Sequence, residues 1–137
     1  MQAWFAQIDV FKNVADKLKT DYRFLMALSA QETTWGSALS FRVKNNLFGV
    51  SFKERPLKYS SYQESADAWI KTFGKDVSGT SSIDDFVEGL KSSGPYEKPY
   101  NSVNSNYFSE LRQRYDDLFR RAAYCGLNIL GSTAAGL

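Results

Sequence analysis

Residues 24–50, FLMALSAQETTWGSALSFRVKNNLFGV, are the stretch that decides the fold expected for this chain. The first half has the period of an α-helix, with Asp21 as a plausible N-cap. Its apolar stripe consists of Phe24, Leu25, Leu28 and Trp35. The second half ends in an aromatic, glycine-terminated loop, NNLFG, at 45–49 (the NNLFG loop). Glu32 interrupts the apolar stripe shortly before this loop and is therefore a candidate functional residue.

Glu32 falls in the same narrow helical sector as Leu25 and Leu28, so its carboxyl group points toward or along the buried face. Loss of hydration in such a place favours the neutral acid, which can donate a proton to a leaving group. The alternative is a glutamate at the rim of the stripe, solvated or paired with Arg23 or Lys44. Periodicity alone favours neither interpretation.

The composition removes most other catalytic chemistry. The 137 residues include no histidine and one cysteine, Cys125. Ser-His-Asp and Cys-His sites, an intrachain disulfide and most zinc sites are therefore excluded, and we expect no metal and no cofactor. The net charge of +2 is mild and dispersed, which argues against a nucleic-acid partner.

The N-terminal sequence lacks the basic region and continuous apolar core of a Sec signal, and no apolar run approaches transmembrane length. We therefore expect a protein that is made in the cytoplasm, does not insert into membranes and leaves the cell by another route or by lysis. We also expect it to be a monomer.

Hydrophobic periodicity and turn residues predict a mostly helical α+β domain over residues 1–130, with about five helices and one small β-hairpin lobe. The predicted helices cover residues 3–18, 21–35, 61–74, 83–90 and 107–124. Ser61 and Ser82 are expected to cap two of them, and Gly74 is expected to end one. The hairpin lies within 45–60, and the tail 131–137 is expected to be frayed.

Other candidate site residues are a glutamate and several tyrosines. Glu54 is a possible second carboxylate for glycosidic chemistry, although a solvated position between Lys53 and Arg55 explains it as well. Tyr59, Tyr96, Tyr100 and Tyr107 are aromatic candidates for packing or for stacking on sugar rings. Tyr96 and Tyr100 lie in the polar stretch 91–106, where no helical stripe accounts for them.

The order of these motifs resembles the bacterial glucosaminidase family, the peptidoglycan-cleaving N-acetylglucosaminidases of glycoside hydrolase family 73. That family's pattern contains Glu-Ser-Gly-Trp-Gly, a short spacer and then Asn-Asn-Leu-Phe-Gly. The matching residues here are Ala27, Ala30, Glu32, Trp35, Gly36, Asn45, Asn46, Leu47, Phe48 and Gly49. The segments 59–69 and 100–107 resemble later blocks of the same family more weakly.

The resemblance implies a lysozyme-like fold and roles for particular residues. Glu32 matches the family's general acid, and Tyr100 matches a tyrosine held to be important for catalysis. Trp35, Asn46 and Phe48 match residues that shape the cleft and support the acid. We expect these three, together with Tyr59, Tyr96 and Tyr107, to bind substrate. Glu54 is the candidate for the second carboxylate.

The sequence also departs from the family pattern. Thr33 and Thr34 replace the Ser-Gly that follows the glutamate, and the late block is one residue longer between its tyrosines. The segment between Gly49 and Tyr59, where the family often carries its second carboxylate, is short.

The expected function is therefore an endo-β-N-acetylglucosaminidase that cleaves peptidoglycan glycan strands. The alternatives are a muramidase or lytic transglycosylase of the same superfamily, or a non-catalytic wall-binding module. Two biological settings suit such a chain: a phage endolysin, or an antibacterial effector delivered by a secretion system. Either would act in the periplasm or cell wall of a target bacterium. An effector would have a cognate immunity protein that occupies the cleft.

Overall fold

Helices make up most of the structure, a computed structural model in which residues 1–92 and 106–129 are described. In chain order the helices are α1 (Gln2–Phe5), α2 (Ile8–Leu18), α3 (Tyr22–Thr33), α4 (Leu39–Arg42), α5 (Tyr62–Trp69), the π-helical turn η1 (Ile70–Gly74), α6 (Lys75–Val77), α7 (Ile83–Lys91) and α8 (Tyr107–Tyr124). The strands β1 (Ser51–Phe52) and β2 (Arg55–Pro56) pair antiparallel. The predicted class, mostly helical with one small hairpin, is confirmed.

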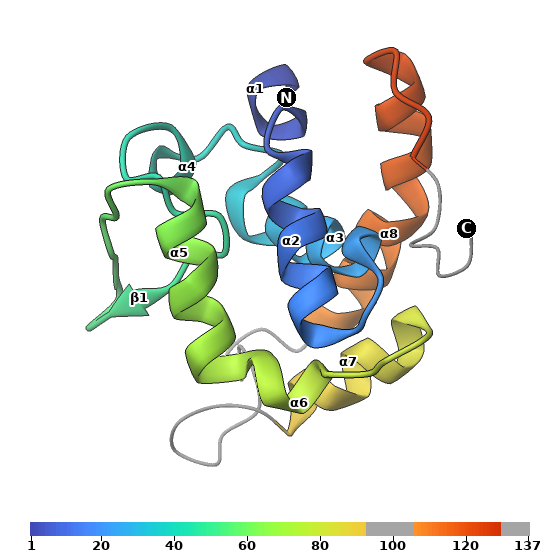
Figure 1. Cartoon of the computed structure of the whole chain (residues 1–137). Coiled ribbons are helices and arrows are strands. Elements are labelled where there is room, and N and C mark those ends of the chain that lie inside the picture. Colours follow the sequence, from blue (N-terminus) through green and yellow to red (C-terminus); the bar gives the residue numbers. More distant parts are fainter. Residues whose placement is uncertain (93–105, 130–137) are drawn as a thin grey trace.

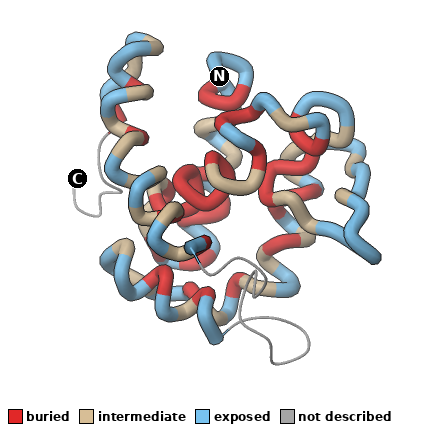
Figure 2. Tube along the Cα trace, turned by 180° about the vertical axis from the view of Figure 1, so that it is seen from behind, coloured by how far each residue is buried: buried red, intermediate tan, exposed pale blue. Residues whose placement is uncertain are grey.

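The centre of the fold is α3, which packs between α2 and α8 (Figure 1). Every residue from Phe24 to Ala30 is buried, so the helix is covered on almost all sides. Figure 2 shows this buried segment inside the more exposed outer helices. The single stripe expected from the sequence is therefore wrong in detail: α3 ends at Thr33, and Trp35 lies outside it. When a helix is buried on nearly all sides, its hydrophobic residues do not follow a 3.6-residue period, so the sequence cannot show which face is buried.

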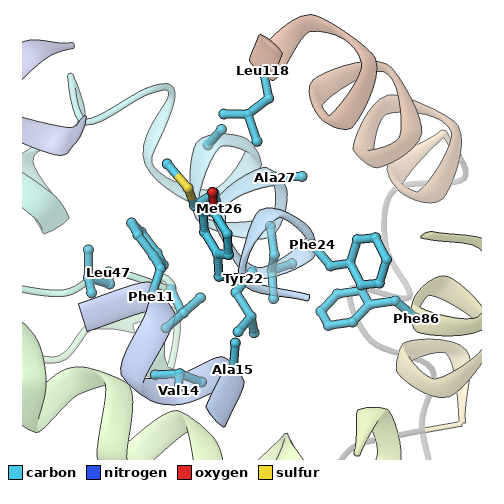
Figure 3. Packing of buried hydrophobic residues seen from close by; sticks show 14 of the residues in the cluster. Phe11, Val14, Ala15, Tyr22, Phe24, Met26, Ala27, Leu47, Phe86 and Leu118 are labelled. Carbon is cyan, nitrogen blue, oxygen red and sulfur yellow. The ribbon is translucent and has the colours of Figure 1, made fainter. Parts of the chain in front are cut away.

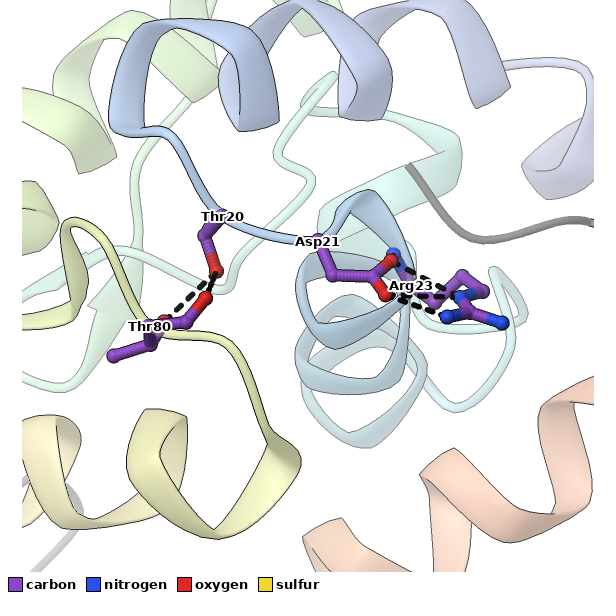
Figure 4. Close-up of polar contacts among 4 residues, drawn as sticks. All are labelled: Thr20, Asp21, Arg23 and Thr80. Carbon is purple, nitrogen blue, oxygen red and sulfur yellow. Dashed lines mark hydrogen bonds and ion pairs between the residues drawn. The ribbon is translucent and has the colours of Figure 1, made fainter. Parts of the chain in front are cut away.

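Asp21 caps α3 as predicted. Its Oδ1 accepts a hydrogen bond of 2.9 Å from the backbone N–H of Arg23, and the Arg23 guanidinium also donates to the carboxylate (Figure 4). The neighbouring Thr20 hydroxyl lies 2.8 Å from the hydroxyl of Thr80. The turn that starts α3 is thus attached to the loop before α7.

Buried side chains from α2, α3, α7, α8 and the NNLFG loop form one cluster (Figure 3). Phe24 of α3 meets Phe86 of α7 with ring centroids 5.7 Å apart. Phe48 of the NNLFG loop stacks on Trp69 at 4.9 Å and meets the edge of Phe11 at 6.0 Å. The loop that follows Glu32 in sequence is therefore part of the core.

Local signals predicted the helix starts well. The Ser61 hydroxyl accepts from the N–H of Glu64, and the Ser82 hydroxyl accepts from the N–H of Asp85, both at 3.1 Å. The predicted ends of the last two helices, α7 and α8, agree with the structure to within a residue. The capping contacts of α5 and α7 join residues three positions apart, which is why the sequence alone could predict them.

Other elements also differ from the prediction. The expected helix 3–18 is broken into α1 and α2, and α4 was not predicted. Gly74 does not end a helix, because the chain continues through η1 into α6. A Cβ at Gly74 would lie 2.9 Å from Cδ2 of Leu18, so the glycine permits the close approach of α2.

Candidate active site

Glu32 lies in the last turn of α3, facing the first turn of α8. The hydroxyl of Tyr107 donates a hydrogen bond to Oε2 of Glu32. Tyr107 is only 2% exposed, so the donor is supplied by the protein interior. Two residues far apart in sequence are thus joined where α3 and α8 pack together.

The environment of Glu32 favours its protonated form. Burial raises the pKa of this carboxyl group from 4.5 to about 7, and the hydrogen bond from Tyr107 opposes the shift. The cation partners considered from the sequence are engaged elsewhere: Arg23 with Asp21, and Lys44 with the carbonyl of Pro56 at 3.1 Å. No salt bridge within residues 1–92 and 106–129 includes Glu32. The carboxyl group can therefore act as an acid near neutral pH.

Gly49, the last residue of the NNLFG loop, lies directly against this carboxyl group. Its backbone has a φ of +67°, and a Cβ there would be 2.9 Å from Oε1 of Glu32. A larger residue would meet both a strained backbone and the acid. The glycine thus allows the loop backbone to approach the acid.

The NNLFG loop is held by hydrogen bonds of a buried asparagine. The Asn46 amide group donates to the carbonyls of Val50 and Leu57, both at 2.9 Å, and its oxygen accepts from the N–H of Val50 at 3.2 Å. Asn46 is 0% exposed. This one side chain therefore fixes the two ends of the hairpin relative to the loop.

A second set of contacts joins the loop to α1 and α3. Trp4 donates through Nε1 to the Ser29 hydroxyl at 2.9 Å, and Ser29 donates to the carbonyl of Leu47 at 2.6 Å. The N–H of Leu47 donates to the Ser65 hydroxyl at 3.1 Å. These buried polar groups hold the loop beside the end of α3, where Glu32 lies.

The chain turns sharply after Glu32. Thr34, Trp35 and Gly36 have φ values of 51°, 56° and 83°. Thr34 stands where the family pattern has glycine, and a β-branched residue rarely adopts this conformation. The Thr33 hydroxyl stabilises the turn by accepting from the N–H of Gly36 at 3.0 Å.

Three residues expected to bind substrate are buried. Trp35 lies at 5.4 Å from the ring of Trp4, with the Arg121 guanidinium 4.2 Å from its own ring centre. Phe48 is 1% exposed, and Asn46 has the contacts given above. The structure corrects the expectation of direct contact: these side chains support the acid and its loop from within the fold.

The remaining candidates lie in different surroundings. Glu54 is exposed in the two-residue turn of the hairpin, where it and Lys53 have positive φ. Tyr59 is partly buried at the base of the hairpin, and burial raises the pKa of its hydroxyl. Within the described residues, no hydrogen bond joins Glu54 or Tyr59 to Glu32. Tyr96 and Tyr100 lie outside the described residues.

Sequence reasoning missed two contributors to this site. Tyr107 was a candidate for substrate contact, but its hydrogen bond to Glu32 was not anticipated. Ser29 looked like an ordinary residue of α3, yet it attaches the loop. A polar residue inside an apolar helix was the available signal, because buried hydroxyls need partners.

The described part of the chain contains no group of three or more acidic or cysteine side chains that could hold a metal ion. Among the same residues, no helix has both the length and the apolar character needed to cross a membrane.

A solved structure shares this fold. The similarity covers 82% of this chain and 91% of a chain from the structure of a type VI secretion system effector–immunity complex from Pseudomonas protegens. The TM-score is 0.62 and the sequence identity is 25%. No family model matches the sequence, and no curated protein matches it. The likeness covers most of both chains, so it concerns the whole fold rather than a short motif.

Proposed function

We propose that this protein is a peptidoglycan glycoside hydrolase with a lysozyme-like fold, an endo-β-N-acetylglucosaminidase in which Glu32 is the general acid. The observation that carries the proposal is the partly buried carboxyl group of Glu32, with a pKa of about 7, held by Tyr107 and lying against Gly49. The motif resemblance of residues 24–50 to the glucosaminidase family supports the same assignment.

In this mechanism the protonated Glu32 donates its proton to the glycosidic oxygen as the bond to the sugar breaks. The leaving strand departs as an alcohol, and an oxocarbenium-like centre develops on the sugar. Water, directly or after a neighbouring nucleophile, then adds to that carbon and gives up a proton, either to the second catalytic group or to the Glu32 carboxylate. Glu54, Tyr100 or the acetamido group of the substrate itself supplies the second catalytic function.

The small hairpin favours one alternative activity. Its strands have two residues each, and Glu54 is exposed at its turn. A lytic transglycosylase needs a single glutamate, which first donates a proton to the leaving group and then, as a carboxylate, accepts the proton of an internal hydroxyl of the muramic acid sugar that attacks in place of water. The runner-up is therefore a transglycosylase with the same acid.

Product analysis of digested peptidoglycan tests the proposal. We expect mass spectrometry to show new reducing ends on N-acetylglucosamine. An anhydro-muramic end would assign the transglycosylase activity, and a reducing muramic acid end would assign a muramidase. The absence of any cleavage, with the protein still pelleting with walls, would assign a wall-binding module and contradict the proposal.

We further propose that the protein is an antibacterial effector that acts in the periplasm of a rival cell. The likeness to a chain from a type VI secretion effector–immunity complex supports this role over that of a phage endolysin. A producing cell would then need a cognate immunity protein. Co-expression with a neighbouring gene that restores growth of cells carrying this protein in the periplasm would identify it.

Tyr107→Phe is expected to move the pH profile of the enzyme. The variant loses the hydrogen bond that stabilises the carboxylate form, so the pKa of Glu32 should rise further above its usual value. The acid then remains protonated to higher pH, and the alkaline limb of kcat/KM should shift upward, by about half a unit or more. Measured rates across the pH range provide the test.

Tyr115→Phe is the matched control, since it removes a hydroxyl from the same helix away from Glu32. An unchanged alkaline limb in Tyr107→Phe, or the same shift in both variants, would contradict the role given to Tyr107.

A further inference from the structure

The positive charge of the chain is concentrated in one segment. Residues 42–58, which we call the basic lobe, contain five of the 17 lysines and arginines but only one of the 15 acidic residues. The other 12 basic and 14 acidic residues leave the rest of the chain with a net charge of −2. The excess positive charge of this protein therefore belongs to the basic lobe, contrary to the dispersed distribution expected from composition.

Four of the five cations of the basic lobe face solvent, and they have no acidic partner within the part of the chain that the structure describes. Arg42, Lys53, Arg55 and Lys58 are exposed, and the salt bridges among the described residues include none of them. By contrast, cations of α7 and α8 pair with acids of the same helix. A group of exposed, unpaired cations attracts anionic ligands.

Apolar side chains accompany these charges. Phe52 is 64% exposed, and Lys53 Nζ lies 5.5 Å from the centre of its ring. Leu57 is 38% exposed on the other side of the hairpin turn. An exposed ring beside cations can contact a sugar face while the cations bind nearby anions.

The basic lobe is fixed next to the acid. Gly49 contacts Glu32, and β1 begins only two residues later. Phe52 is three positions after Gly49, a separation that an extended chain spans in at most about 10 Å. The amide of Asn46 donates to the carbonyls of Val50 and Leu57, so the backbone at both ends of the hairpin is attached to the NNLFG loop beside Glu32.

We infer that the basic lobe binds the carboxylates of the peptide stems that peptidoglycan strands carry, beside the bond that Glu32 would cleave. This inference rests on the proposed function. A glycan strand whose muramic acid residues bear peptides combines sugar faces with regularly spaced anionic groups. A strand that passes over Glu32 would also meet the basic lobe. A flat anionic surface such as a membrane would not need this position next to the acid.

The test compares soluble glycan strands that retain their peptide stems with strands from which an amidase has removed them. The wild type is expected to have the higher kcat/KM on strands with stems. The double variant Arg55→Gln/Lys58→Gln should lower the ratio of the two kcat/KM values by roughly fivefold. Added salt should lower the same ratio in the wild type.

The control Lys19→Gln/Lys75→Gln removes the same amount of charge from exposed positions outside the basic lobe. It should leave the substrate ratio unchanged. A ratio that is equal for the wild type and Arg55→Gln/Lys58→Gln, or lowered equally by the control, would overturn the inference.

Binding measurements separate this inference from the proposed function. Fluorescence anisotropy of end-labelled strands in a Glu32→Gln background needs no cleavage. Tighter binding of stem-bearing strands, weakened by Arg55→Gln/Lys58→Gln, would support the inference even if neither strand were cleaved. Equal binding of both strands would overturn it. Equal binding together with charge-dependent binding to phosphatidylglycerol vesicles would also overturn it and assign the lobe to a membrane surface.

Discussion

Glu32→Gln is expected to lower the rate of peptidoglycan cleavage by about 10²- to 10⁴-fold while the fold is retained. Glutamine has the shape of the acid and can still accept the hydrogen bond from Tyr107, but it has no proton to give to a leaving group. Release of reducing ends from purified walls measures the activity. Circular dichroism checks that the helical content is unchanged.

Glu88→Gln is the matched control, because Glu88 is exposed on α7 and pairs with Lys91 at 3.1 Å, away from Glu32. It should leave the rate within about twofold of the wild type. Full activity of Glu32→Gln would show that another group is the general acid. Glu54→Gln in the same assay tests the second carboxylate: a comparable loss would assign that role to Glu54, and a small change would favour a single-glutamate mechanism.

The same substitution, Glu32→Gln, is expected to stabilise the protein at high pH. Burial raises the pKa of Glu32 from 4.5 to about 7, so the folded state binds a proton more tightly than the unfolded state does. Below the unfolded-state pKa of 4.5, Glu32 is protonated in both the folded and the unfolded protein, so its ionisation does not change the free energy of unfolding. As the pH rises through the two values, wild-type stability falls, by about 3 kcal/mol in total. Glutamine does not titrate, so the variant does not lose stability in this pH range.

Urea unfolding of both proteins between about pH 4 and pH 8 tests this expectation. The difference in the free energy of unfolding should be small at the acidic end and reach its full size above pH 7. Glu88→Gln again provides the control. A difference that stays constant with pH, or grows toward acid, would show that Glu32 is not held in an environment that favours its neutral form. This measurement does not depend on knowing the substrate.

If both results are obtained, the position of Glu32 lowers the stability of the folded protein and at the same time makes its carboxyl group a better acid. The helix end could hold a neutral side chain at lower energetic cost, as the glutamine variant should show. Active-site acids commonly lower stability in this way, because the same desolvation that raises the pKa opposes burial of the charge.

Much of the fold follows from local patterns. Ser61 and Ser82 mark helix starts because each hydroxyl binds an N–H three residues later. One boundary that differs depends on a distant contact. Gly74 resembles a helix stop in the sequence, but the approach of Leu18 makes it a packing residue inside a continuous helical segment.

For the site, the sequence by itself determined the helical class, the absence of histidine chemistry and the position of Glu32 before the NNLFG loop. Only the tertiary structure decided the partner of Glu32, since Tyr107 lies 75 residues away and meets it only where α3 packs on α8. It also decided that Trp35 and Phe48 are buried. Desolvation depends on every element packed around a group, which no local pattern contains, and desolvation sets the pKa of Glu32.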